Sequence, residues 1–207
     1  MLKRTKGRLL ITLLVVTGLA GTINNNSISQ QERKYALSLL KDSKNNLLDD
    51  AEKLTERQLN YKSPQTQVSI KNCLTQAAIT EKKLWQLVAS ALQQPVNPEK
   101  RSDIKLTDRE VVEMVQSGKI TTLSINTFKQ ANSPWKTANE ATASFKNTRN
   151  DHIKYMKSST EDLRNHIILT PAGWLDCYQV ILLLSASTNH YTGVIEDIRS
   201  DLHFPKK

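Results

Sequence analysis

The sequence predicts an all-α protein, an up-down four-helix bundle with a long connection between its second and third helices. The chain has 207 residues but only 6 Gly, 6 Pro and 5% aromatic residues. A β-sandwich or β-barrel needs more turns and more strand-forming aromatic residues than this composition supplies. Four stretches instead place apolar residues at helical spacing, and none alternates as a half-buried strand does. The 38% hydrophobic and 24% charged content also excludes a disordered chain.

The first two helices are predicted in the first half of the chain. The first is expected over residues 32–59, which contain no Gly or Pro. Its apolar face repeats at spacings of three and four, at Ala36, Leu40, Ser43, Leu47, Ala51 and Leu54. The KSP sequence at residues 62–64 ends this helix. The second is expected to begin near Ser69, whose hydroxyl caps it, and to run to about Gln93, after which two prolines follow.

The third and fourth helices follow a long connection. Residues 94–135 are rich in Ser, Thr, Asn and Lys and contain three prolines, so we expect one short helix there, over residues 107–117. Its first residues, T-D-R-E, form a capping box. The third helix is expected over residues 137–166, where small and apolar residues keep a spacing of three to four. The PAG sequence at residues 171–173 separates it from a fourth helix, expected over residues 174–202.

Residues 1–20 have the pattern of a secretory signal peptide. Four cations, at Lys3, Arg4, Lys6 and Arg8, precede an uncharged run over residues 9–20 that ends in small residues. The run is shorter than the ~20 residues that a bilayer-spanning helix needs, so we expect no permanent membrane anchor. The sequence therefore predicts export to the periplasm or the extracellular space. A loose mature N-terminus is expected over residues 21–31, and the bundle domain over residues 32–205.

The net charge of +9 invites a nucleic-acid function, but its distribution argues against one. Removing residues 1–20 removes four cations and no anion, which lowers the net charge from +9 to +5. The remaining cations are spread along the chain, without a basic block and without interleaved aromatic residues. We therefore expect a mildly basic, solvated surface and no nucleic-acid partner.

The histidines are the first candidates for metal-binding or catalytic residues. His152 lies on the apolar stripe of the predicted third helix, where it is either a buried histidine bonded to a neighbour or a metal ligand. His166 and His203 fall at predicted helix ends, where a cation suits the helix dipole. The chain has no HExxH, CxxC, phosphate-binding loop or nucleophile elbow. No motif therefore supports catalysis.

Cys73 and Cys177 lie within apolar helical stretches of a chain that we expect to be exported. That compartment permits a disulfide. We favour two buried, separate thiols, because a bridge requires Cα atoms about 4.4–6.8 Å apart and neither position indicates such proximity.

Two segments resemble signatures of the DinB-like superfamily. Residues 68–81 (VSIKNCLTQAAITE) resemble its second-helix pattern W-S-x-x-E-x-x-x-H-x-A-x-x-E. Residues 185–196 (SASTNHYTGVIE) resemble its fourth-helix pattern H-x-x-x-H-x-x-Q-I. Further similarities occur at Phe145, Arg149, residues 162–166 (DLRNH) and the terminal Phe204-Pro205. The resemblance covers roughly residues 33–205, and it depends on the order and spacing of these motifs.

This resemblance implies a four-helix bundle, often dimeric, that binds a divalent metal through three histidines, one from helix 2 and two from helix 4. Characterised members include metal-dependent thiol transferases and hydrolase-like proteins. In this chain the three ligand positions fall on Gln76, Ser187 and Tyr191. His190 lies one residue before a ligand position, which turns it about 100° around the helix. Val194 replaces the signature glutamine and Val68 its tryptophan.

Amide, hydroxyl and phenol groups are poor substitutes for imidazole around Zn²⁺ or Ni²⁺. The resemblance and its departures therefore predict a bundle without metal or other cofactor, whose former ligand positions hydrogen-bond to one another.

The first functional hypothesis is an exported, non-catalytic binding or interaction module. Its partner would be a second copy in a homodimer, a small molecule or an envelope protein. The alternative is a metal-dependent hydrolase or thiol transferase with other ligands, in which His152 supplies the imidazole. The third hypothesis is a structural role in an envelope assembly.

Overall fold

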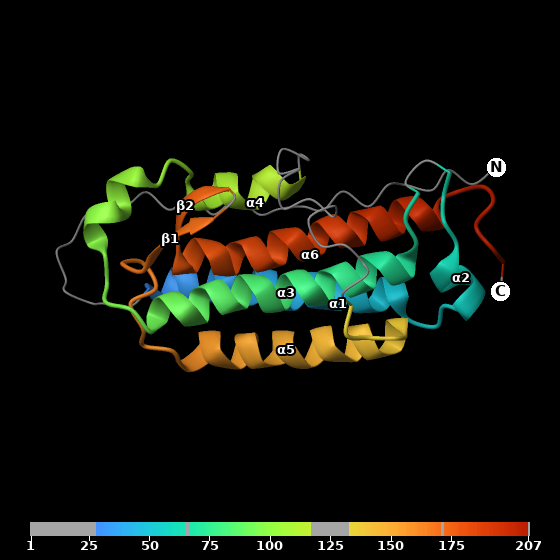
Figure 1. Cartoon of the computed structure of the whole chain (residues 1–207), viewed down its shortest axis with the longest axis horizontal. Helices are drawn as coiled ribbons and strands as arrows, with labels where there is room; N and C mark the ends of the chain where they lie inside the picture. Colours follow the sequence, from blue (N-terminus) through green and yellow to red (C-terminus); the bar gives the residue numbers. More distant parts are fainter. Residues whose placement is uncertain (1–27, 65–66, 117–132, 171, 207) are drawn as a thin grey trace.

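Four long helices form a bundle in the computed structural model, which describes residues 28–64, 67–116, 133–170 and 172–206. The predicted fold class is confirmed (Figure 1). The four helices are α1 (Gln30–Ala51), α3 (Ile70–Leu92), α5 (Ala138–Ser158) and α6 (Cys177–Arg199). The contacts α1–α6, α6–α3, α3–α5 and α5–α1 close a ring, so each long helix packs against two others.

Shorter helices and strands connect the four long helices. They are the helices α2 (Glu56–Asn60) and α4 (Asp108–Gln116), the 3₁₀ helix η1 (Pro98–Asp103), and the strands β1 (Ile167–Thr170) and β2 (Gly173–Asp176). The strands form an antiparallel hairpin in which Ile168 pairs with Leu175. α4 packs against α6, and η1 contacts β1. In Figure 1 the hairpin and α4 lie on the same side of α6, away from α5.

The contacts fix the direction of α1 and α6. The Tyr178 hydroxyl donates to the Glu32 carbonyl oxygen near the start of both helices, and Arg199 pairs with Asp50 near their ends. α1 and α6 therefore run parallel to each other.

α3 and α5 also run parallel. Glu81 of α3 pairs with Arg149 of α5, and one turn later on α3 Trp85 meets Tyr155 of α5. The directions of α1, α3, α5 and α6 are therefore up, down, down and up. Successive long helices alternate in direction except for α3 and α5, which the long connection joins. That connection contains the predicted short helix, α4, and returns the chain to the end at which α3 begins.

Local capping signals in the sequence correspond to helix starts in the structure. The Ser69 hydroxyl accepts the backbone N–H of Asn72 at the start of α3. The Thr107 hydroxyl accepts the N–H of Glu110, whose carboxylate accepts the N–H of Thr107. Both are the reciprocal pairs that a capping box requires.

The predicted first helix proves to be two. α1 begins at Gln30, two residues before the expected start, and the buried Ile28 precedes it. It ends at Ala51, and Lys53 then adopts a positive φ of 63°. Thr55 starts α2 with a capping box of its own, in which the Thr55 and Gln58 side chains accept each other's backbone N–H groups. These bonds favour a new helix start at Thr55 over a continuation of α1.

The predicted third helix is too long. α5 ends at Ser158 rather than at residue 166, because Arg33 of α1 donates to the carbonyl oxygens of Met156 and Ser159 and satisfies the helix end. Leu163 still reaches the core, but from a loop.

The predicted fourth helix starts too early. Trp174 belongs to β2, and the helix begins after Asp176, whose carboxylate accepts the N–H of Gln179. Strand structure was not expected. A two-stranded hairpin is marginal in water, and here it is joined to the bundle through contacts with α3 and α6.

Among the described residues, the core consists of two clusters at opposite ends of the bundle. One, at the hairpin end, includes Leu40, Leu84, Met156, Tyr178 and Leu182. The other includes Leu47, Ile70, Phe145, Tyr191 and Ile198. Cys73 belongs to the second cluster and Cys177 to the first, and both are free, buried thiols, which agrees with the favoured interpretation. Burial raises the pKa of each thiol to about 12.

The predicted signal peptide, residues 1–20, lies outside the described residues. Within the described ranges, no helix is both long enough and apolar enough to cross a membrane.

Candidate functional site

The three positions that match the ligand positions of the resemblance are buried on two neighbouring helices. Gln76 belongs to α3, and Ser187 and Tyr191 are one turn apart on α6. α3 and α6 pack against each other along the bundle. The structure therefore places all three side chains inside the protein, on the helix pair named by the resemblance.

Tyr191 is tied to α3 by its hydroxyl. The Tyr191 oxygen lies 3.0 Å from Oγ1 of Thr80, one turn after Gln76. Thr80 is a partner that the sequence did not predict, since hydrogen bonds were expected among Gln76, Ser187 and Tyr191. Burial raises the pKa of Tyr191 to about 12, so the phenol is neutral at physiological pH. His190 is half-buried with its ring edge-on to Tyr191, and burial lowers the pKa of His190.

These donors do not fit a divalent metal of the kind that the resemblance implies. Three imidazole nitrogens suit Zn²⁺ or Ni²⁺, whereas an amide, a hydroxyl and a neutral phenol do not. Over the part of the chain that the structure describes, no group of three His, Cys, Asp or Glu side chains could hold a metal elsewhere. We therefore assign no metal-dependent step to Gln76, Ser187 and Tyr191.

A charged layer crosses the middle of the bundle, between the two core clusters. Arg149 and Glu81 form a two-pronged ion pair, with Nε 2.7 Å from Oε1 and Nη2 2.6 Å from Oε2. Neither side chain is accessible to solvent. The other N–H groups of Arg149 reach α1 and α6, at the Leu40 carbonyl, the Ser43 hydroxyl, the Leu184 carbonyl and the Thr188 hydroxyl. One guanidinium therefore links α5 to the other three long helices.

His152 belongs to the same layer. Its Nδ1 lies 2.7 Å from Oε1 of Glu81, and its ring stacks on Trp85 with 3.9 Å between centroids. Burial alone would raise the pKa of Glu81, but the charge and hydrogen bonds of Arg149, aided by His152, hold that pKa below its usual value. His152 thus has the contacts of a buried histidine bonded to a neighbour, the first of the two interpretations.

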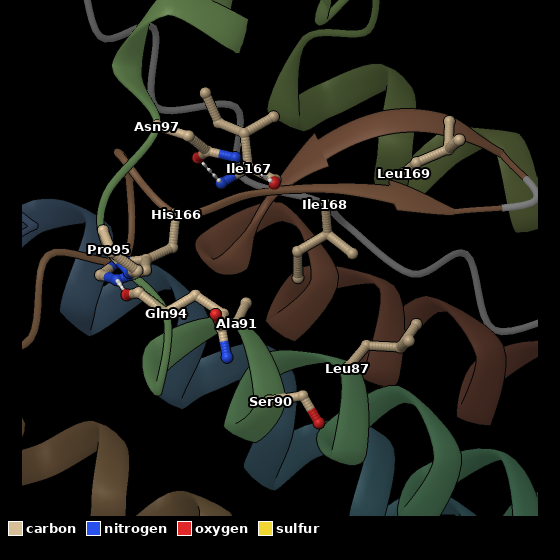
Figure 2. A pocket seen from close by; sticks show the side chains of 10 residues that line it. All are labelled: Leu87, Ser90, Ala91, Gln94, Pro95, Asn97, His166, Ile167, Ile168 and Leu169. Carbon is tan, nitrogen blue, oxygen red and sulfur yellow. Dashed lines mark hydrogen bonds between the residues drawn. The ribbon is translucent and has the colours of Figure 1, made fainter.

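A pocket of about 380 Å³ lies between the C-terminal end of α3 and β1 (Figure 2). Leu87, Ala91, Ile168 and Leu169 contribute its apolar lining. Leu169 is 63% exposed, so part of this apolar lining is open to solvent. An opening of this size with a mainly apolar lining suits a small molecule.

Polar groups of the chain shape one end of this pocket. The side-chain amide of Asn97 accepts the N–H of Ile167 at 2.8 Å and donates to the Ile167 carbonyl at 3.0 Å, so it pairs with the outer edge of β1 as a neighbouring strand would (Figure 2). Nδ1 and Nε2 of His166 lie 2.8 and 3.0 Å from the carbonyl oxygens of Asp162 and Gln94. The expectation that His166 ends a helix is wrong, because α5 stops before it. The ring instead joins the loop before β1 to the end of α3.

Comparisons with known proteins identify the fold. No protein-family model matches the sequence, and no curated protein matches it significantly. Among solved structures, the chain is similar to YfiT from Bacillus subtilis, described as a probable metal-dependent hydrolase with an unusual four-helix bundle topology. The TM-score is 0.59 at 12% identity, over 84% of this chain and 89% of YfiT. At this identity the similarity establishes the four-helix fold.

The pairing of Glu81 with Arg149 was not predicted from the sequence. The sequence contains a pattern that could have indicated the pair, because Glu81 and Arg149 each interrupt a row of apolar residues at helical spacing. Glu81 lies between Ala77 and Leu84 on α3, and Arg149 lies between Phe145 and His152 on α5. Two opposite charges on apolar stripes of different helices indicate a buried pair, since a lone buried charge is too costly.

Proposed function

We propose that the protein is an exported, non-catalytic and metal-free DinB-like bundle that acts as a binding or interaction module. The observation that carries the proposal is that Gln76, Ser187 and Tyr191, at the positions that the resemblance gives to metal ligands, are buried side chains other than histidine, with the Tyr191 hydroxyl bonded to Thr80. A neutral phenol engaged with a neighbouring helix has a structural partner in place of a metal. The YfiT-like fold supports the architecture, and the residues within it support the loss of metal.

The charged layer also favours a structural interior. Glu81 accepts hydrogen bonds from Arg149 through both oxygens and contacts His152 through one of them. A carboxylate so engaged is held in its charged form and is poorly placed to exchange protons with a substrate. The geometry of His152 therefore gives no support to the alternative of a hydrolase or transferase that uses other ligands. Binding is better supported by the pocket beside β1, whose lining is mainly apolar.

Restoring the histidines tests the proposal. We expect the wild-type chain to show no saturable heat on titration with Zn²⁺ or Ni²⁺ by calorimetry. The triple variant Gln76→His, Ser187→His, Tyr191→His should gain one metal site and a metal-dependent rise in Tm, because ligands that bind only the folded state stabilise it. A matched variant with three histidines one residue away, at Ala77, Thr188 and Thr192, should gain neither.

Two results would count against the proposal in different ways. Tight one-to-one binding of Zn²⁺ by the wild type, weakened by Gln76→Ala, would contradict the metal-free state. Failure of the folded triple variant to bind metal would contradict the assignment of these positions to a former ligand set.

A further inference from the structure

A basic groove of about 400 Å³ lies between α1 and α5, away from the positions discussed above. Seven residues line it, namely Lys41, Lys44 and Asn45 of α1 and Asn150, Ile153, Lys154 and Lys157 of α5. Four are lysines, two are asparagines and none is acidic. Ile153 is buried, so lysine and asparagine side chains supply the accessible lining of the groove and give it a positive charge.

The ammonium groups of the groove lack counter-ions. Across the described residues, no carboxylate lies within ion-pairing distance of any of the four. Lys44 donates to Oδ1 of Asn150 at 3.0 Å, which holds one ammonium across the gap between the helices. Four like charges around one hollow repel each other, and an anion placed among them relieves that repulsion.

Helix dipoles do not account for this arrangement. Lys154 and Lys157 lie in the last two turns of α5, where cations favour the negative end of the dipole. Lys41 and Lys44 lie in the middle of α1, where the dipole gives no such preference. The helix dipole therefore does not explain why these two lysines line the same groove as Lys154 and Lys157.

We propose that this groove is a binding site for a soluble, linear anion that carries several phosphate groups. On each helix the two lysines are three residues apart, which corresponds to about 4.5 Å along the axis. Because α1 and α5 run in opposite directions and Lys44 lies against Asn150, the four lysines are staggered along the groove and offer charges to successive phosphates of one chain. Lysine binds phosphate as a point charge without a fixed planar geometry, and the Asn45 side chain adds a further donor.

The concave shape favours a chain-like ligand over other polyanions. A membrane presents a broad surface to a protein, whereas this site is a hollow between two helices. A single-stranded nucleic acid gains affinity by stacking its bases on aromatic side chains, and no aromatic residue lines the groove.

Calorimetric titration of the full chain with inorganic tripolyphosphate tests the site. We expect one-to-one binding that weakens with added salt, because screening acts on exposed charges. Lys44→Ala with Lys154→Ala should weaken binding at least about tenfold, since two of four charges are lost. The control pair Lys71→Ala with Lys105→Ala removes the same net charge elsewhere and should leave the affinity nearly unchanged. Lys44→Arg with Lys154→Arg retains both charges and should bind.

Each other outcome overturns the proposal. Absence of binding at millimolar tripolyphosphate would contradict the proposed site. An equal loss of affinity in the control variant would show that tripolyphosphate is attracted by the basic surface in general and not by the groove. Binding to phosphatidylglycerol vesicles or to an oligonucleotide without binding to tripolyphosphate would assign the groove to a membrane or a nucleic acid instead. Circular dichroism establishes that each variant is folded before its titration is interpreted.

Discussion

A single side chain, Arg149, organises the interior of the bundle. Its guanidinium is fully buried, pairs with both oxygens of Glu81 and also contacts α1 and α6. A buried ion pair is often no more stable than an apolar replacement, but removal of one partner leaves the other charged without compensation. We therefore expect the loss of one partner alone to destabilise the bundle severely.

Substitution of Arg149 by Met tests this account at the residue scale. We expect the free energy of unfolding to fall by roughly 3–5 kcal/mol, because Glu81 stays buried without its cation. Denaturation in urea, followed by circular dichroism, measures the change. Arg149→Met with Glu81→Leu should recover part of the loss. The control Arg199→Met breaks a partly exposed pair with Asp50 and should cost no more than about 1 kcal/mol. Equal effects of Arg149→Met and Arg199→Met would contradict the role of the charged layer.

At the scale of elements, Arg164 joins parts of the chain that are far apart in sequence. Its guanidinium contacts Glu32 in the first turn of α1, Asp108 in the first turn of α4 and Asp176 at the cap of α6. It also stacks on Tyr178, with 4.1 Å from Cζ to the ring centroid. Three carboxylates of three elements thus share one cation, which ties the start of α4 to the bundle in addition to the packing of α4 on α6.

Substitution of Arg164 by Ala should loosen α4 selectively. Loss of several charged hydrogen bonds, each worth about 1.5–3 kcal/mol, leaves Asp108 and Asp176 repelling each other. Amide hydrogen exchange should accelerate in residues 108–116 and change little in the middle of α3 and α5. The control Arg109→Ala breaks an exposed pair with Glu113 within α4 and should have a small effect. Uniform acceleration throughout the chain would contradict a local role for Arg164.

For the whole molecule, the four-helix fold was predictable because amphipathic periodicity and capping are local signals. The capping residues Ser69 and Thr107 could be recognised from three or four consecutive positions. The hairpin could not, because its strands have four residues each and depend on packing against the bundle. The end of α5 was missed for the same reason, since Arg33, more than a hundred residues earlier, satisfies its last carbonyls.

In the candidate sites, too, local features could be predicted from the sequence, whereas contacts between distant segments could not. Gln76, Ser187 and Tyr191 were found by comparison with a local signature, and each is buried on the predicted helix. Thr80 as the partner of Tyr191 required the packing of α3 on α6. The basic groove was not predictable, because its lysines come from segments more than a hundred residues apart and form no basic run in the sequence.

The most direct test of the central claim is the metal content of the purified protein. Protein prepared without a histidine tag or a chelator, and analysed for its elements by mass spectrometry, should contain far less than one zinc or nickel ion per chain. This result follows if Gln76, Ser187 and Tyr191 have replaced a ligand set with donors that these metals do not favour. One ion per chain, retained on dialysis and lost in the variant Tyr191→Phe, would contradict it.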